Sequence, residues 1–170
     1  MFDACVLGVD PGIARIGVAA VARDRRETKL VWAATVRTSA DLDEASRLER
    51  IARAIRDAIA TQRPTSVAVE RVAWNRNASS AMAVARATGV ILLAAAEAGL
   101  PLEEYGPLEV KMAITGLGTA DKRQVQEALT RVHGLRDVPT DADAADAVAV
   151  ALCHLTRSRL RSAAERAGSR

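Results

Sequence analysis

Aromatic side chains are almost absent from this chain of 170 residues. They make up 2% of the sequence and are limited to Phe2, Trp32, Trp74 and Tyr105. The core must therefore be aliphatic, although 49% of the residues are hydrophobic. A broad platform of stacked rings is excluded as well, which argues against nucleic-acid readers of the RRM and single-strand OB classes.

Cysteine and long apolar runs are also scarce. Cys5 and Cys153 both lie in apolar runs, which favours small buried hydrophobes over metal ligands or a disulfide and fits a reducing compartment. The N-terminus lacks the basic region and long apolar stretch of a signal peptide. No apolar run approaches the roughly 20 residues of a spanning helix. We therefore expect a soluble, cytoplasmic protein.

The charge balance is mildly basic. The net charge is +3 and the sequence pI is about 9.3, which suits a polyanionic partner. The C-terminal end carries five arginines against one acid, Glu165: these are Arg157, Arg159, Arg161, Arg166 and Arg170. This end is either a solvated terminus or an arm that contacts phosphate. We expect one domain over residues 1–157 and a basic, flexible tail over residues 158–170.

The order of apolar patterns predicts an α/β domain with a five-stranded mixed sheet and helices on both faces. Strands are predicted at 4–10, 16–22, 29–37, 65–70 and 102–105, and the short links between the first three predict an antiparallel meander. Helices are predicted at 41–61, 77–98, 108–115, 121–132 and 141–157. Gly89 lies inside the second of these helices. A glycine there costs about 1 kcal/mol and indicates close approach of another backbone, either the sheet or a second subunit.

Four carboxylates stand out against this pattern. Asp10 and Glu70 each end an apolar strand, Asp146 interrupts an apolar run, and Asp143 lies three residues before it. An unpaired buried carboxylate costs several kcal/mol or gives up its charge. Three of these acids also have a simpler interpretation, whereas Asp146 has only apolar neighbours. Asp10 can cap a turn, Glu70 can pair with Arg71, and Asp143 can complement a helix dipole.

The four acids together favour a metal site. Ligand sites cluster at the carboxyl ends of strands in open α/β sheets, where Asp10 and Glu70 fall. Asp143 and Asp146 share one helical face. Four such oxygen ligands could hold two hard cations roughly 3.5–4 Å apart, which stabilise the attacking and leaving oxygens of phosphodiester cleavage. Asp141 is a possible further ligand, but we favour it, or Thr140, as the helix N-cap.

A basic cluster is predicted around Lys111 and Lys122. Residues 115–123 form a glycine-containing loop before a helix N-terminus, where free backbone N–H groups bind phosphate readily. The alternative is that the loop only ends one helix, turns the chain and caps the next helix, and this is favoured for a lone G-x-G. With Lys122 and Arg123 beside the loop, contact with a DNA backbone is reasonable.

These residues, in this order, resemble the crossover (Holliday) junction endodeoxyribonuclease RuvC family. The match runs from Leu7 to about Leu155 and rests on four stretches, each weak alone. They are the G-V-D-P-G motif at 8–12, V-E-R-V at 69–72 with Asn77 and Gly89, E-V-K at 109–111 with T-G-L-G-T-A-D-K-R-Q-V at 115–125, and D-A-A-D-A at 143–147 with Cys153-His154.

The resemblance implies an RNase H-like fold and a homodimer that nicks a four-way DNA junction symmetrically. It implies Mg²⁺ or Mn²⁺, two ions per site, at Asp10, Glu70, Asp143 and Asp146, with Lys111 and Lys122 at the cleavage site. The partner proteins would be the RuvA–RuvB branch-migration complex. The residues expected to contact DNA are Ala73, Trp74, Arg76, Asn77, Arg86, Lys111, Lys122 and Arg123.

Two departures from the family pattern concern engagement of the junction. The family has a phenylalanine that stacks on junction bases where this chain has Ala73. Either Trp74 takes over the stacking or the junction is distorted differently. Arg86 stands where the family has a glutamine in the long helix, and it adds positive charge there. Two other functions fit parts of this sequence. An actin-like or sugar-kinase-type phosphotransferase would need a second subdomain, and a non-catalytic junction-binding protein would not need four acids.

Overall fold

The computed structural model describes residues 2–25, 27–71 and 78–168. Strands β1 (Ala4–Asp10), β2 (Arg15–Arg23) and β3 (Thr28–Arg37) form the predicted antiparallel meander. Strand β4 (Ser66–Glu70) pairs in parallel with β1, and β5 (Leu102–Tyr105) pairs in parallel with β4. The strand order is β3-β2-β1-β4-β5, which confirms the predicted five-stranded mixed sheet.

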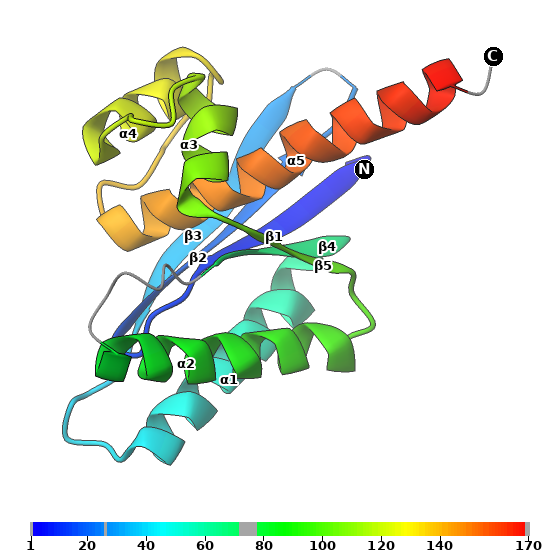
Figure 1. Cartoon of the computed structure of the whole chain (residues 1–170). Helices are drawn as coiled ribbons and strands as arrows, with labels where there is room; N and C mark the ends of the chain where they lie inside the picture. The colour runs from blue at the N-terminus through cyan, green and yellow to red at the C-terminus, as the bar shows by residue number, and fades with distance from the viewer. Residues whose placement is uncertain (1, 26, 72–77, 169–170) are drawn as a thin grey trace.

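Helices lie on both faces of this sheet, as Figure 1 shows. Helices α1 (Glu44–Gln62) and α2 (Ala78–Glu97) cover one face, and α3 (Pro107–Thr115), α4 (Lys122–Arg131) and α5 (Ala142–Gly168) lie on the other. Helix α5 crosses the strands of the meander, so its first turns come close to the carboxyl end of β1. None of the described helices is long and apolar enough to cross a membrane.

Capping residues account for the helix starts that differ from the prediction. Helix α1 begins at Glu44 rather than residue 41 because Asp43 is its N-cap and accepts a hydrogen bond from the Ser46 N–H at 2.7 Å. Helix α4 begins after Asp121 for the same reason.

Helix α5 also differs from the prediction, at its end. It continues past residue 157 to Gly168, through a segment rich in alanine and arginine that favours helix. The backbone of most of the predicted tail is therefore helical, whereas the domain boundary after residue 157 stays a prediction.

The core is aliphatic and divided by the sheet. Alternate residues of β1 point to opposite faces, so Val6 packs under α5 while Leu7 and Val9 pack against α1 and α2. Cys5 and Cys153 are free and buried, as predicted. Burial raises the pKa of the Cys153 thiol to about 11, so this thiol stays protonated and unreactive at neutral pH.

Two glycines allow α5 to lie directly on the sheet. A Cβ on Gly8 would overlap the Ala147 carbonyl oxygen and stand 2.7 Å from the Ala151 nitrogen. A Cβ on Gly17 would overlap the Asp143 carbonyl group. Real Cβ atoms essentially never approach other atoms within 3.0 Å. Only glycine therefore permits this contact between helix and sheet.

Gly89 has no such role within the described part of the chain. A Cβ there would have nothing within 4 Å. The interpretation that the sheet approaches Gly89 is therefore wrong, because α2 turns this position away from the sheet. Approach by a second subunit remains a prediction.

Candidate active site

Asp10 and Glu70 lie side by side at the ends of neighbouring parallel strands. The register pairs Val9 with Val69, so the next residue of each strand is an acid. Side chains alternate between the two faces of the sheet along each strand. Asp10 therefore lies on the same face as Gly8, and Glu70 lies on the same face as Ala68. That face is covered by α5. Both carboxylates therefore point toward the first turns of this helix.

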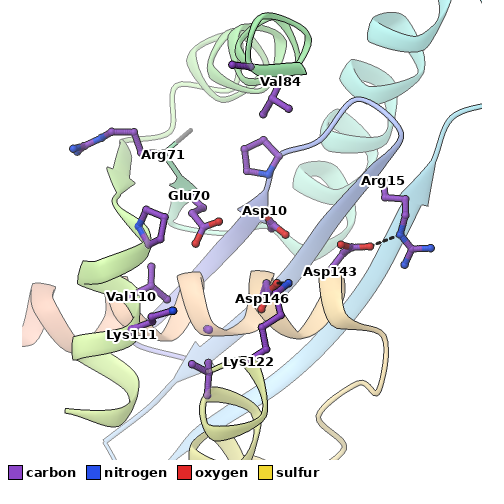
Figure 2. A pocket seen from close by; sticks show the side chains of 15 residues that line it. Asp10, Arg15, Glu70, Arg71, Val84, Val110, Lys111, Lys122, Asp143 and Asp146 are labelled. Atoms are coloured by element: carbon purple, nitrogen blue, oxygen red, sulfur yellow. Dashed lines mark hydrogen bonds and ion pairs between the residues drawn. The ribbon is translucent and has the colours of Figure 1, made fainter. Parts of the chain in front are cut away.

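Helix α5 adds the other two acids. Asp143 and Asp146 line one pocket together with Asp10 and Glu70, and Figure 2 shows the four carboxylates around a common space. Gly17 pairs with Asp10 in the sheet register and is also the residue that admits the Asp143 backbone. The close packing of α5 on β2 is therefore what brings the strand-end acids and the helix acids together.

Asp141 is the cap of α5, as we favoured from the sequence. Its Oδ1 accepts hydrogen bonds from the backbone N–H groups of Asp143 and Ala144, at 3.2 and 3.4 Å. A hydrogen bond from the Thr35 hydroxyl, and next one from Arg15, lower the pKa of Asp141 to about 2. Asp141 does not line the pocket. These contacts favour the cap over the role of a further metal ligand.

Two lysines reach the pocket from the α3–α4 side. Lys122 donates a hydrogen bond from Nζ to Asp146 Oδ2 at 2.7 Å, and this bond raises the pKa of Lys122. Lys111 lines the same pocket, and in Figure 2 its side chain extends toward the acids. The predicted cluster of four acids and two lysines is thus brought together in one place.

The glycine loop before α4 is a helix stop, turn and cap. Gly116 ends α3 in a left-handed conformation, with φ of 75°. Asp121 then caps α4 by accepting a hydrogen bond from the Gln124 N–H at 2.8 Å. That N–H is therefore already paired with the cap, whereas contact of Lys122 and Arg123 with a DNA backbone stays a prediction.

The electrostatics of the pocket favour a cation. Burial raises the pKa of the Asp10 carboxyl to about 8, and repulsion from Glu70, Asp146 and Asp143 adds to this shift, while Lys122 opposes it. A proton on Asp10 thus relieves the crowding of negative charge. A divalent cation would relieve it more completely, because it attracts all the carboxylates at once.

The donor chemistry fits hard divalent cations such as Mg²⁺ or Mn²⁺, since all four acids offer oxygen ligands. Over residues 2–25, 27–71 and 78–168, however, no three acid, histidine or cysteine side chains stand close enough to hold one ion. The four carboxylates instead line one pocket and face a common space between them.

Among the other predicted DNA contacts, the two that the structure describes do not line this pocket. Arg86 pairs with Glu44 of α1 at 2.5 Å, and Arg123 pairs with Glu127 at 2.9 Å. Arg157, the first arginine of the C-terminal end, donates to a carboxylate oxygen of Glu109 at 2.6 Å, and a phosphate-contacting role of this end stays a prediction. Ala73, Trp74, Arg76 and Asn77 lie outside the described residues, so their contacts with DNA stay predictions.

Arg15 was missed by the sequence analysis. It lines the pocket and donates hydrogen bonds to both Asp143 and Asp141. The available signal was its place two residues before Gly17, at the start of the strand that pairs with β1. Arg71 also lines the pocket, but it was considered only as an ion-pair partner of Glu70. Its guanidinium points outward in Figure 2 and donates to the Glu104 carbonyl at 3.2 Å.

Comparison with known proteins assigns the chain to a family. Residues 6–154 match the family model of the crossover junction endodeoxyribonuclease RuvC. The chain belongs to the RuvC family. The RuvC of Syntrophomonas wolfei is 43% identical over 157 residues, covering 92% of this chain and 91% of the relative. The RuvC of Salinispora arenicola is 46% identical over 167 residues, covering 95% of both chains.

Solved structures agree with this assignment. The structure of Thermus thermophilus RuvC is 35% identical, with a TM-score of 0.83 over 92% of this chain and 96% of that one. The same protein in complex with a Holliday junction substrate gives a TM-score of 0.86, at the same identity and coverage. The chain thus has the RNase H-like fold of RuvC, as expected, and belongs to a family of DNA endonucleases.

Proposed function

We propose that this RuvC-family chain is a metal-dependent endonuclease that resolves four-way DNA junctions during recombination and repair. The observation that carries the proposal is the convergence of Asp10, Glu70, Asp143 and Asp146 on one pocket beside two lysines. Its relative from Thermus thermophilus has been solved with a Holliday junction. A pocket with this much negative charge repels DNA phosphate unless cations lie between them, so binding alone would not require these residues.

The four acids would hold Mg²⁺ or Mn²⁺, with two ions per site. Such ions supply a nucleophilic water at neutral pH and stabilise the leaving oxygen. The protein's own lysines have a separate role. Lys122 is bonded to Asp146, yet its side chain is 70% exposed. Lys122 would donate to a phosphate oxygen bound at this pocket and would stabilise its negative charge in the transition state.

Symmetric nicking requires two copies of the pocket, and α2 offers a surface for a second copy. Met82, Leu92 and Leu93 are 55%, 37% and 53% exposed, and Gly89 on the same helix has open space above it. Ala81 and Val84 of this helix line the pocket. A homodimer formed through α2 would therefore hold two pockets in a fixed relation. The RuvA–RuvB complex as a partner and a cytoplasmic location are carried over from the family.

The dimer is tested by the oligomeric state of the full chain in light scattering. Leu93→Asp places a charge in the proposed contact and should yield monomers. Leu117→Asp is the matched control, because Leu117 is similarly exposed, at 58%, but lies beyond α3. A dimer that survives Leu93→Asp would contradict the role of α2.

The activity is tested with a labelled mobile four-way junction, incubated with and without Mg²⁺, and the nicks are mapped on each strand. The expected result is Mg²⁺-dependent nicks at symmetric positions on two opposed strands. Asp146→Asn should retain junction binding and lose cleavage. If the wild-type protein binds junctions but never cuts them with Mg²⁺ or Mn²⁺, the chain is a non-catalytic binding protein. If Asp146→Asn cuts normally, the assignment of Asp146 is wrong.

A further inference from the structure

Arg15 links two acids that lie two residues apart at the start of α5. Its Nε donates to Asp143 Oδ2, and its Nη2 donates to Asp141 Oδ2 at 2.7 Å. Both nitrogens belong to one guanidinium, which is planar and rigid. The position of Asp141 therefore determines where the guanidinium lies, and the guanidinium in turn determines where Asp143 Oδ2 lies.

Asp141 is well suited to be the fixed end of this link. Thr35 of β3 donates its hydroxyl to Asp141 Oδ1 at 2.6 Å, and Arg37 donates to Oδ2 at 3.3 Å. The backbone N–H groups of Asp143 and Ala144 also donate to Oδ1. With donors from β2, β3 and its own helix, the Asp141 carboxylate is held in one orientation.

We propose that Arg15 is a positioning residue for Asp143. By holding Oδ2 against the Asp141 anchor, Arg15 fixes the rotamer of Asp143 and leaves Oδ1 for a divalent cation. This inference rests on the proposed metal site. Carboxylates that bind metals are commonly held by a second hydrogen-bond partner, and loss of such a partner typically costs about 10- to 100-fold in metal affinity or activity.

Arg15 could instead act through its charge, and that possibility predicts the opposite result. A positive charge beside Asp143 repels an incoming cation, so removal of the charge alone should tighten metal binding. Loss of positioning should weaken it. The direction of the change in affinity therefore separates the two roles.

The experiment is a titration of the full-length, DNA-free protein with Mn²⁺ alone, in which free Mn²⁺ is measured by electron paramagnetic resonance. We expect Arg15→Gln to weaken Mn²⁺ binding by about 10- to 100-fold. Arg15→Lys should fall between this variant and wild type, because an ammonium can meet only one carboxylate well. Arg37→Gln is the matched control. It removes the same charge from a side chain that contacts Asp141 but not Asp143 and is 62% exposed, and it should stay within about twofold of wild type.

A second readout is the dependence of junction cleavage on Mg²⁺. If Arg15 positions Asp143, Arg15→Gln raises the Mg²⁺ concentration needed for half-maximal rate, and high Mg²⁺ restores most of the rate. Equal or tighter Mn²⁺ binding by a folded Arg15→Gln variant overturns the proposal. Should that variant fail to fold, wild-type Mn²⁺ affinity in Arg15→Lys overturns it equally. Failure of the wild-type protein itself to bind Mn²⁺ would instead contradict the proposed metal site.

Discussion

Replacement of Gly17 by alanine is the most direct test of how the site is assembled. The new Cβ would overlap the Asp143 carbonyl group, and the neighbouring atoms belong to backbone that cannot rotate away. Helix α5 must therefore retreat from β2, by on the order of 1 Å. Overpacking of this kind typically costs about 1–3 kcal/mol. For a chain of this size, that corresponds to a fall in Tm of roughly 3–10 °C.

The same retreat should reduce activity more than stability. Asp143 and Asp146 move with α5, whereas Asp10 and Glu70 stay with the sheet. A misplacement of about 1 Å can cost on the order of 100-fold in rate. The assay compares thermal unfolding and junction cleavage at saturating Mg²⁺ for Gly17→Ala and a control. Gly106→Ala is suitable, because its Cβ would meet only the flexible Glu109 side chain, at 3.4 Å, and should cost about 1 kcal/mol or less.

Two results would refute this reasoning. If Gly17→Ala keeps the wild-type Tm and full activity, the close contact between α5 and β2 does not hold the site together. If Gly17→Ala loses stability but keeps its cleavage rate, α5 can shift without disturbing the acids.

Three further predictions concern single groups. Because Asp10 binds a proton more tightly in the folded than in the unfolded protein, the metal-free protein should lose stability as pH rises from about 4 to 8. In thermal unfolding, Asp10→Asn should make the stability less dependent on pH. An unchanged dependence on pH would contradict the raised pKa of Asp10. Burial raises the pKa values of the Cys5 and Cys153 thiols, so both should react with iodoacetamide only when the protein unfolds. Rapid labelling of the native protein would show that these thiols are accessible. Tyr105→Phe removes the hydroxyl that lies 2.9 Å from His154 Nδ1, so urea unfolding should show a free energy of unfolding lower by about 1–2 kcal/mol. A conservative change at the exposed Leu117 should show no such loss.

Local sequence pattern determined most of the fold. The strands at 4–10 and 102–105 have the predicted bounds, and the other predicted elements are all present. The prediction is wrong at helix ends, where a single side chain decides which residue begins the helix. Asp43 and Asp121 were expected inside their helices and instead cap them. Capping depends on whether a single carboxylate accepts a backbone hydrogen bond, which residue periodicity does not reveal.

The acids of the site were also found from local pattern, because a charge at the end of an apolar strand or inside an apolar helix is costly unless it has a use. Sequence alone thus determined which side chains are candidates, and the family resemblance indicated their role. Only the tertiary structure decided how they are arranged. Arg15 and Asp143 are 128 positions apart, and they meet because β2 lies beside β1 in the sheet and α5 crosses both strands through Gly8 and Gly17. Such contacts depend on which surfaces pack together, and no spacing within a single segment encodes that choice.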